Sequence, residues 1–202
     1  MSLHPLHLQD LKDSGLSDET IALMAVYSMS PAQITRFVGS DNPAIESALA
    51  FPYFAADGSK SKFIRIKIFP TLVDAAGHKT KYLQPKDSRP ALYILPAVTK
   101  YLDDAKQPLY VVEGEKKTAK ACEDGLAAVG IGGVWNWVQK SKQEPIEDFS
   151  TINLWRREIV IVPDSDTWGE EKKAAGIRRA VYYLARELKL RGAGVRFLKL
   201  GL

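Results

Sequence analysis

The stretch LYVVEGEKKTAKACEDGLAAVGIGG, residues 109–133, decides the fold class that the sequence predicts. It opens with a short apolar run that has the length and composition of a buried strand and ends at Glu113-Gly114. Residues 116–124 then predict a helix that stops at a glycine, and residues 127–131 predict a second strand. A strand, a helix and a further strand in this order are typical of a right-handed crossover between parallel strands.

The same alternation continues toward the end of the sequence. The run Ile159-Val160-Ile161-Val162 is β-branched throughout, as expected for a strand buried on both faces of a parallel sheet. A long helix is predicted from about Glu170 to Leu190, because apolar residues recur at spacings of three and four: Ile177, Val181, Leu184 and Leu188. Residues 195–198 close the pattern. We therefore predict an α/β, Rossmann-like fold with a four-stranded parallel sheet flanked by helices.

Acidic residues follow two of these predicted strands. Glu113 comes after the first strand, and Asp164 and Asp166 come after the third. Ligands of an open parallel sheet bind outside the carboxyl ends of its strands, so we expect the three carboxylates to converge there. Clustered carboxylates repel one another unless a cation neutralises them, and an all-oxygen site suits Mg²⁺ or Mn²⁺. We predict the three as metal ligands and catalytic residues; the alternative is that they only cap helices and complete turns.

The first half of the sequence has a different character. Residues 7–39 predict short helices, because Ser17 and the run Ser30-Pro31-Ala32-Gln33 are helix-start signals. Residues 48–94 predict strands, since β-formers such as Ile64, Ile66 and Ile68 alternate there with basic residues. These patterns predict three parts: a small helical head at 1–47, a basic β-rich subdomain at 48–105, and the α/β domain at 106–202.

Charge is unevenly distributed along the 202 residues. Residues 1–50 hold two basic and six acidic residues, whereas residues 57–90 hold eight Lys and Arg against three Asp. A basic body with an acidic head favours a polyanionic partner for the body over an ordinary solvated surface.

Composition excludes several other classes of protein. The chain is 46% hydrophobic and 26% charged, which excludes wholesale disorder, and no apolar run approaches the ~18 residues of a membrane span. No signal peptide is visible. The single cysteine, Cys122, provides neither an internal disulfide nor a zinc cluster and is expected to be buried. These features predict a cytoplasmic protein without a membrane partner.

Two motifs resemble a known family. Residues 111–133 and IVIVPDSDTWG at 159–169 are similar to a toprim domain, the catalytic fold shared by topoisomerases and bacterial-type primases. The whole chain also resembles a family of phage and plasmid replication modules with EGEKKA-like and GGVWNW-like stretches, which residues 113–117 and 132–137 match. The resemblance implies a DNA primase-like, metal-dependent nucleotidyltransferase in which Glu113, Asp164 and Asp166 hold Mg²⁺ or Mn²⁺.

The resemblance also implies partners. Arg65 and Lys81-Tyr82 are similar to residues of the basic subdomain that precedes the toprim domain in bacterial and phage primases, where they face template and nucleotide. Lys116 and Lys117 follow the Glu-Gly pair and are expected to meet phosphates, with plain surface charge as the alternative. The partners expected are single-stranded DNA or a primer-template, nucleotides, and a replicative helicase domain.

The sequence departs from the primase pattern in two ways. Lys117 stands where primases often carry an acid, and no cysteines are present for a zinc-binding module. Three functions therefore stay open: primase-like nucleotidyl transfer in DNA replication, a toprim-type metal-dependent nuclease, and a non-catalytic DNA-binding or helicase-docking module.

The aromatic and basic side chains in the second half of the sequence can each be interpreted in two ways. Trp135 and Trp137 could stack on bases, but a packing lid over the sheet is the favoured interpretation, and Tyr182-Tyr183 is interpreted as core and rim. The basic face of the long predicted helix is either solvated or in contact with a DNA backbone; it comprises Arg178, Arg179, Arg186, Lys189 and Arg191.

Overall fold

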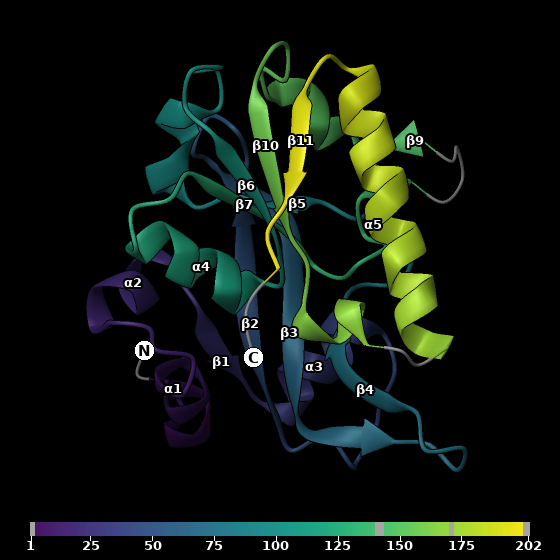
Figure 1. Ribbon diagram of the computed structural model, residues 1–202. Coiled ribbons are helices and arrows are strands. Elements are labelled where there is room, and N and C mark those ends of the chain that lie inside the picture. Colours follow the sequence, from purple (N-terminus) through teal and green to yellow (C-terminus); the bar gives the residue numbers. More distant parts are fainter. Residues whose placement is uncertain (1–2, 140–143, 170–171, 200–202) are drawn as a thin grey trace. The chain divides into compact units, whose positions relative to one another are not determined.

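The computed structural model describes residues 3–139, 144–169 and 172–199, and the chain in it forms two compact units (Figure 1). The first unit comprises Met1–Tyr53 and Lys60–Arg89, and the second comprises Phe54–Ser59 and Pro90–Leu202. The three-part division predicted from the sequence is finer than these two units and stays a prediction. Within the described ranges, no helix is long and apolar enough to cross a membrane.

The first unit is built on a four-stranded sheet with the strand order β1-β2-β3-β4. Its apolar core includes Met29, Ile34, Ile45, Ile66 and Ile68. The elements in chain order are α1 (Pro5–Lys12), α2 (Asp18–Leu23), β1 (Tyr27–Met29), α3 (Pro31–Val38), β2 (Ser47–Phe54), β3 (Lys60–Val73) and β4 (Lys79–Leu83).

The helix-start signals of this unit are confirmed. The Ser17 side chain accepts a hydrogen bond from the Thr20 backbone N–H at the start of α2. At α3, the Ser30 backbone N–H donates to Gln33 Oε1 at 2.8 Å, and the helix ends at Gly39 with a φ of 81°. The expectation that residues 7–39 are purely helical is wrong for β1, which pairs antiparallel with β2. A strand of three residues is too short to show an alternating pattern in the sequence, and it forms because it pairs with β2.

The second unit contains a five-stranded sheet with the order β11-β10-β6-β7-β5. Its elements are β5 (Leu92–Tyr93), η1 (Pro96–Tyr101), β6 (Leu109–Glu113), α4 (Glu115–Glu123), β7 (Ala128–Ile131), β8 (Val138–Gln139), β9 (Glu144–Pro145), η2 (Glu147–Thr151), β10 (Glu158–Val162), η3 (Ser165–Trp168), α5 (Lys172–Leu190) and β11 (Gly194–Phe197). Strands β6, β7, β10 and β11 are mutually parallel, as predicted.

The predicted strand count of four is wrong for this sheet. The fifth strand, β5, pairs antiparallel with β7 through Leu92↔Ile131 and Tyr93↔Gly130. It is two residues long and lies between Pro90 and Pro96, so neither its length nor its flanks predict a place in this sheet.

Helices α4 and α5 pack on different parts of this sheet. Helix α4 contacts β6 and β7, whereas α5 contacts β11 and runs alongside it (Figure 1). Gly130 on β7 permits the close approach of α4, because a Cβ there would lie 2.5 Å from Thr118 Oγ1. The glycine thereby lets α4 pack directly against β7.

A buried arginine joins the two chain segments that precede β6 and β10. The Arg157 side chain is 0% exposed and precedes β10. Its guanidinium donates hydrogen bonds to four carbonyl oxygens: Gln107 at 2.9 Å, Leu102 at 2.8 Å, Tyr101 at 2.7 Å and Asn153 at 3.5 Å. Burial lowers its pKa, and nearby Asp104 and Asp103 oppose that shift. Arg157 thus ties the loop before β6 to the turn before β10.

Candidate active site

Glu113 and Asp164 lie at the same edge of the second unit's sheet. Strands β6 and β10 are parallel neighbours, with Val112 opposite Val162. Glu113 is the last residue of β6, and Asp164 follows the end of β10 by two residues. Neighbouring strands are about 4.8 Å apart, so these two acids belong to one small region at the carboxyl edge. Both side chains are partly exposed.

Asp166 belongs to the 3-10 helix η3, which begins three residues after the end of β10. Its side chain lies outside the described part of the structure, so the convergence of all three acids stays a prediction. Among the side chains that are described, no group of three or more His, Cys, Asp or Glu could hold a metal ion. That search includes only two of the three predicted ligands.

A lysine lies against one of the predicted ligands. Lys117 Nζ forms an ion pair with Asp164 Oδ1, bringing α4 into contact with the loop after β10. The turn at Gly114, with a φ of 92°, starts α4 immediately after Glu113 and so places its first turn at this edge. Lys116, one residue earlier, is half-buried. This edge of the sheet therefore holds two acidic side chains and the positively charged side chain of Lys117.

Arg178 on α5 holds the loop that carries the predicted Asp-x-Asp ligands. Its Nη1 donates to the carbonyl oxygens of Thr167 at 3.1 Å and Gly169 at 2.7 Å. Sequence analysis assigned Arg178 only to a basic helix face and missed this role. The sequence does contain a signal for this role: only a few residues separate the loop from Arg178. A long donor side chain so close in the sequence can reach the carbonyl oxygens of the loop.

Glu115 was also missed by sequence analysis. It is 1% exposed in the first turn of α4, although a glutamate at such a position is usually solvated. Nearby Tyr93 is completely buried, and its pKa is raised well above its ordinary value by that burial and secondarily by the Glu115 charge. These two residues form a buried polar region where β5 and α4 meet β7.

The residues that the primase resemblance places against template and nucleotide, Arg65, Lys81 and Tyr82, belong to the first unit. The Arg65 guanidinium lies over the Tyr82 ring, with 4.4 Å from Cζ to the ring centroid. These side chains come from neighbouring strands, because Lys67 on β3 is opposite Tyr82 on β4. Lys81 is exposed on β4. The structure thus brings Arg65 and Tyr82 together, and both belong to a different unit from the acids.

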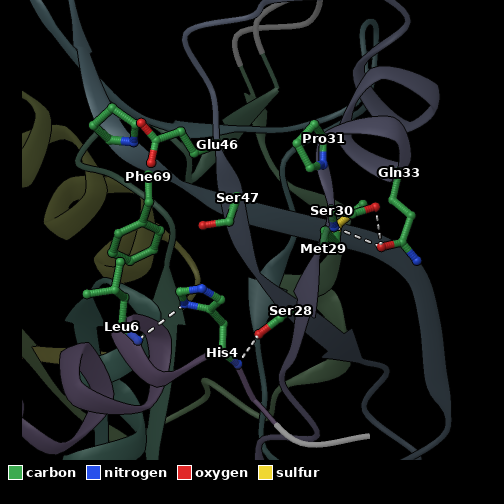
Figure 2. A pocket seen from close by; sticks show the side chains of 11 residues that line it. His4, Leu6, Ser28, Met29, Ser30, Pro31, Gln33, Glu46, Ser47 and Phe69 are labelled. Atoms are coloured by element: carbon green, nitrogen blue, oxygen red, sulfur yellow. Dashed lines mark hydrogen bonds between the residues drawn. The ribbon is translucent and has the colours of Figure 1, made fainter.

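The first unit also contains a cavity of about 610 Å³, with His4, Ser28, Ser47 and Phe69 among its lining residues (Figure 2). His7 bonds two of these lining residues and is 0% exposed, with Nδ1 2.8 Å from Ser28 Oγ and Nε2 3.0 Å from Ser47 Oγ. Burial lowers the His7 pKa to about 4. A neutral imidazole fixed between two hydroxyls is a structural network that holds α1 against β1 and β2.

The two tryptophans after β7 have different environments. Trp137 is 3% exposed, in line with the predicted packing lid, whereas Trp135 is 40% exposed. The ring centroid of Trp135 lies 6.4 Å from that of Tyr183 on α5. Tyr182 and Tyr183 are 64% and 40% exposed, so their interpretation as core and rim is wrong for Tyr182.

Comparison with protein families identifies the second half of the chain. Residues 99–201 match a family described as a domain of unknown function, DUF3854. The chain belongs to this family. No curated protein matches the chain.

Comparison with solved structures identifies the fold. One similar structure is the crystal structure of the Aquifex aeolicus primase (zinc-binding and RNA polymerase domains), with a TM-score of 0.65 and 13% identity over 98% of this chain. Another is the DnaG catalytic core, with a TM-score of 0.61 and 19% identity over 100% of this chain. The chain spans 50% of the first structure's length and 66% of the second's. At these identities the likeness shows a primase-like mixed α/β fold.

Proposed function

We propose that this DUF3854 protein is a primase-like toprim module of a mobile-element DNA replication protein. In this proposal it binds single-stranded DNA or a primer-template and carries out Mg²⁺-dependent nucleotidyl transfer. One observation carries the proposal: Glu113 and Asp164 follow neighbouring parallel strands in a chain whose fold is similar to primase cores. Ligands of open parallel sheets bind at that edge.

The predicted donor set fits a hard divalent cation. Carboxylate oxygens are the ligands that Mg²⁺ and Mn²⁺ prefer, and the Lys117 ammonium beside Asp164 is a stand-in for such a cation. Glu113, Asp164 and Asp166 would hold the ion. When bound, it would supply Lewis-acid polarisation of a phosphoryl oxygen.

The remaining residues would bind and orient the reactants. Arg65, Lys81 and Tyr82 would hold template and nucleotide in the first unit, and Lys116 would neutralise phosphate at the acid edge. Arg178, bonded to the Thr167 and Gly169 carbonyls, would keep the loop of the acids in place. The reaction would join a 3′-hydroxyl to an α-phosphate with loss of pyrophosphate.

A second candidate function is favoured by the Lys117–Asp164 ion pair. A site that supplies its own cation needs no metal to neutralise that carboxylate, as expected of a non-catalytic DNA-binding or helicase-docking module. A toprim-type nuclease would use the same acids with water as the nucleophile.

One assay separates these functions: incubation of the chain with a labelled primer-template, nucleotides, and Mg²⁺ or Mn²⁺. Extension of the primer supports nucleotidyl transfer, and metal-dependent shortening identifies a nuclease. Binding retained in chelator without turnover under either metal identifies the non-catalytic module. The binding itself should weaken with salt, with a slope of roughly −0.7 per phosphate contact on single strands. Arg65→Ala with Lys81→Ala should flatten that slope.

A further inference from the structure

The outward face of α5 combines basic and aromatic side chains. Arg179, Tyr182, Tyr183 and Arg186 recur at spacings of three and four, which places them on one side of the helix. All four are exposed. The tyrosine rings lie 6.1 Å apart between centroids, and the two arginines lie about 10 Å apart along the axis at 1.5 Å per residue.

Trp135 extends this face beyond α5. It belongs to the segment that follows β7, the sheet neighbour of β6, and its ring lies 6.4 Å from the Tyr183 ring. The three exposed rings therefore lie together, two on α5 and one on the segment after β7. We name this surface, made of Trp135, Tyr182, Tyr183, Arg179 and Arg186, the α5 platform.

An ordinary solvated helix face does not account for the α5 platform. Exposed aromatic rings that gather together mark interaction sites more often than rings scattered singly. Of the neighbouring residues on the last turns of α5, Lys189 is exposed, and the acidic Glu187 is half-buried at the margin. The platform thus has aromatic rings between two positive charges. It is complementary to a polyanion whose flat rings can stack on the aromatic side chains while its negative groups pair with the arginines.

We propose that the α5 platform binds single-stranded nucleic acid, with unpaired bases stacked on the tyrosine and tryptophan rings and phosphates paired with Arg179 and Arg186. The proposal rests on the proposed function, and it adds a binding surface in the same unit as the acids. Stacking accepts every base, so binding should show little sequence preference.

The test uses fluorescence anisotropy of a labelled 15-nucleotide oligo(dT) with the full chain in chelator, so that no metal contributes. Tyr182→Ala with Tyr183→Ala should weaken binding at least about tenfold, because each lost stacking contact is worth about 1–3 kcal/mol. Tyr182→Phe with Tyr183→Phe keeps both rings and should stay within about twofold. Arg179→Gln with Arg186→Gln should reduce the salt slope by roughly 1.4, whereas Lys106→Gln, an exposed charge on a turn, is the control.

The outcomes distinguish this proposal from the proposed function. If the parent chain binds oligo(dT) and the double alanine variant binds equally well, the platform is overturned while the proposed function stands. If the parent chain binds no oligonucleotide, both fail. If the alanine variant changes only the sedimentation behaviour of the chain, the face is a contact between copies, which also overturns the proposal. Circular dichroism of each variant checks that a loss of binding is not a loss of fold.

Discussion

Lys117 Nζ is paired with Asp164 Oδ1, a contact between residues 47 positions apart in the sequence. Lysine and aspartate are 54% and 35% exposed, so solvent screens the pair and the attraction is modest. Its importance is its position, since Asp164 is also a predicted metal ligand. A metal ion that binds Asp164 has to displace the ammonium or share the carboxylate with it.

This pairing predicts that Lys117 weakens metal binding. Lys117→Met should tighten Mn²⁺ binding by roughly fivefold, because removing a nearby exposed charge is worth about 1 kcal/mol. Titration of Mn²⁺ followed by electron paramagnetic resonance measures the Kd. Lys116→Met is the matched control, with the same loss of charge one residue away and a smaller expected effect. Equal or weaker Mn²⁺ binding in the Lys117 variant would show that the lysine does not compete with the metal.

A pH dependence of stability follows from His7. Burial lowers its pKa from 6.5 to about 4; His4 and Lys67 act in the same direction, and Asp10 opposes them. The unfolded chain therefore binds a proton at higher pH than the folded chain. The contribution to the free energy of unfolding is complete above about pH 6.5 and decreases as the pH falls toward 4, by about 3 kcal/mol in all.

Two measurements check this expectation. Urea midpoints should fall between pH 7 and pH 4.5 and the fall should be smaller in His7→Asn, while NMR should show the His7 ring still neutral at pH 5. A His7 ring that titrates near pH 6.5 would contradict its burial between Ser28 and Ser47.

Arg157 should be the most sensitive of the arginines to substitution. Arg157→Met removes the side-chain donor from the carbonyl oxygens of Gln107, Leu102 and Tyr101, of which the last two still accept a backbone N–H. We therefore expect a loss of about 1–3 kcal/mol in the free energy of unfolding. Arg156→Met is the matched control, because Arg156 is exposed and should change stability by less than about 0.5 kcal/mol. Equal denaturation midpoints for the two variants would refute the bridging role of Arg157.

The elements that form the candidate site could be predicted because each has a strong local signal. The apolar run before Glu113 and the β-branched run before Asp164 correspond to β6 and β10 within one residue. A continuous apolar strand followed by an acid at a turn is a pattern of short range. It depends on neighbouring residues rather than on the rest of the chain.

The contacts that were not predicted join distant parts of the sequence. The Lys117–Asp164 pair, the bonds from Arg157 to the loop before β6 and the His7 network each connect residues at least 21 positions apart. A single sequence shows that such residues are present but not which partners the fold brings to them. The strand β5 is a similar case, since two residues between prolines have no pattern of their own and pair only because β7 is adjacent.

The most direct test of the catalytic proposal compares activity and stability in Asp164→Asn and Glu113→Gln. The parent chain should incorporate nucleotides into a primer-template with Mg²⁺ or Mn²⁺, and both variants should lose this activity, because a ligand for the metal is gone. Without metal, the Tm of Glu113→Gln should be unchanged or slightly raised, since neutralising one of several clustered carboxylates relieves repulsion. The Tm of Asp164→Asn should change little, because solvent screens the Lys117 pair that this variant loses. A clear fall in Tm, corresponding to the loss of ~1 kcal/mol of stability that is typical of a lost cap, together with retained activity would contradict the proposal and identify the two acids as structural.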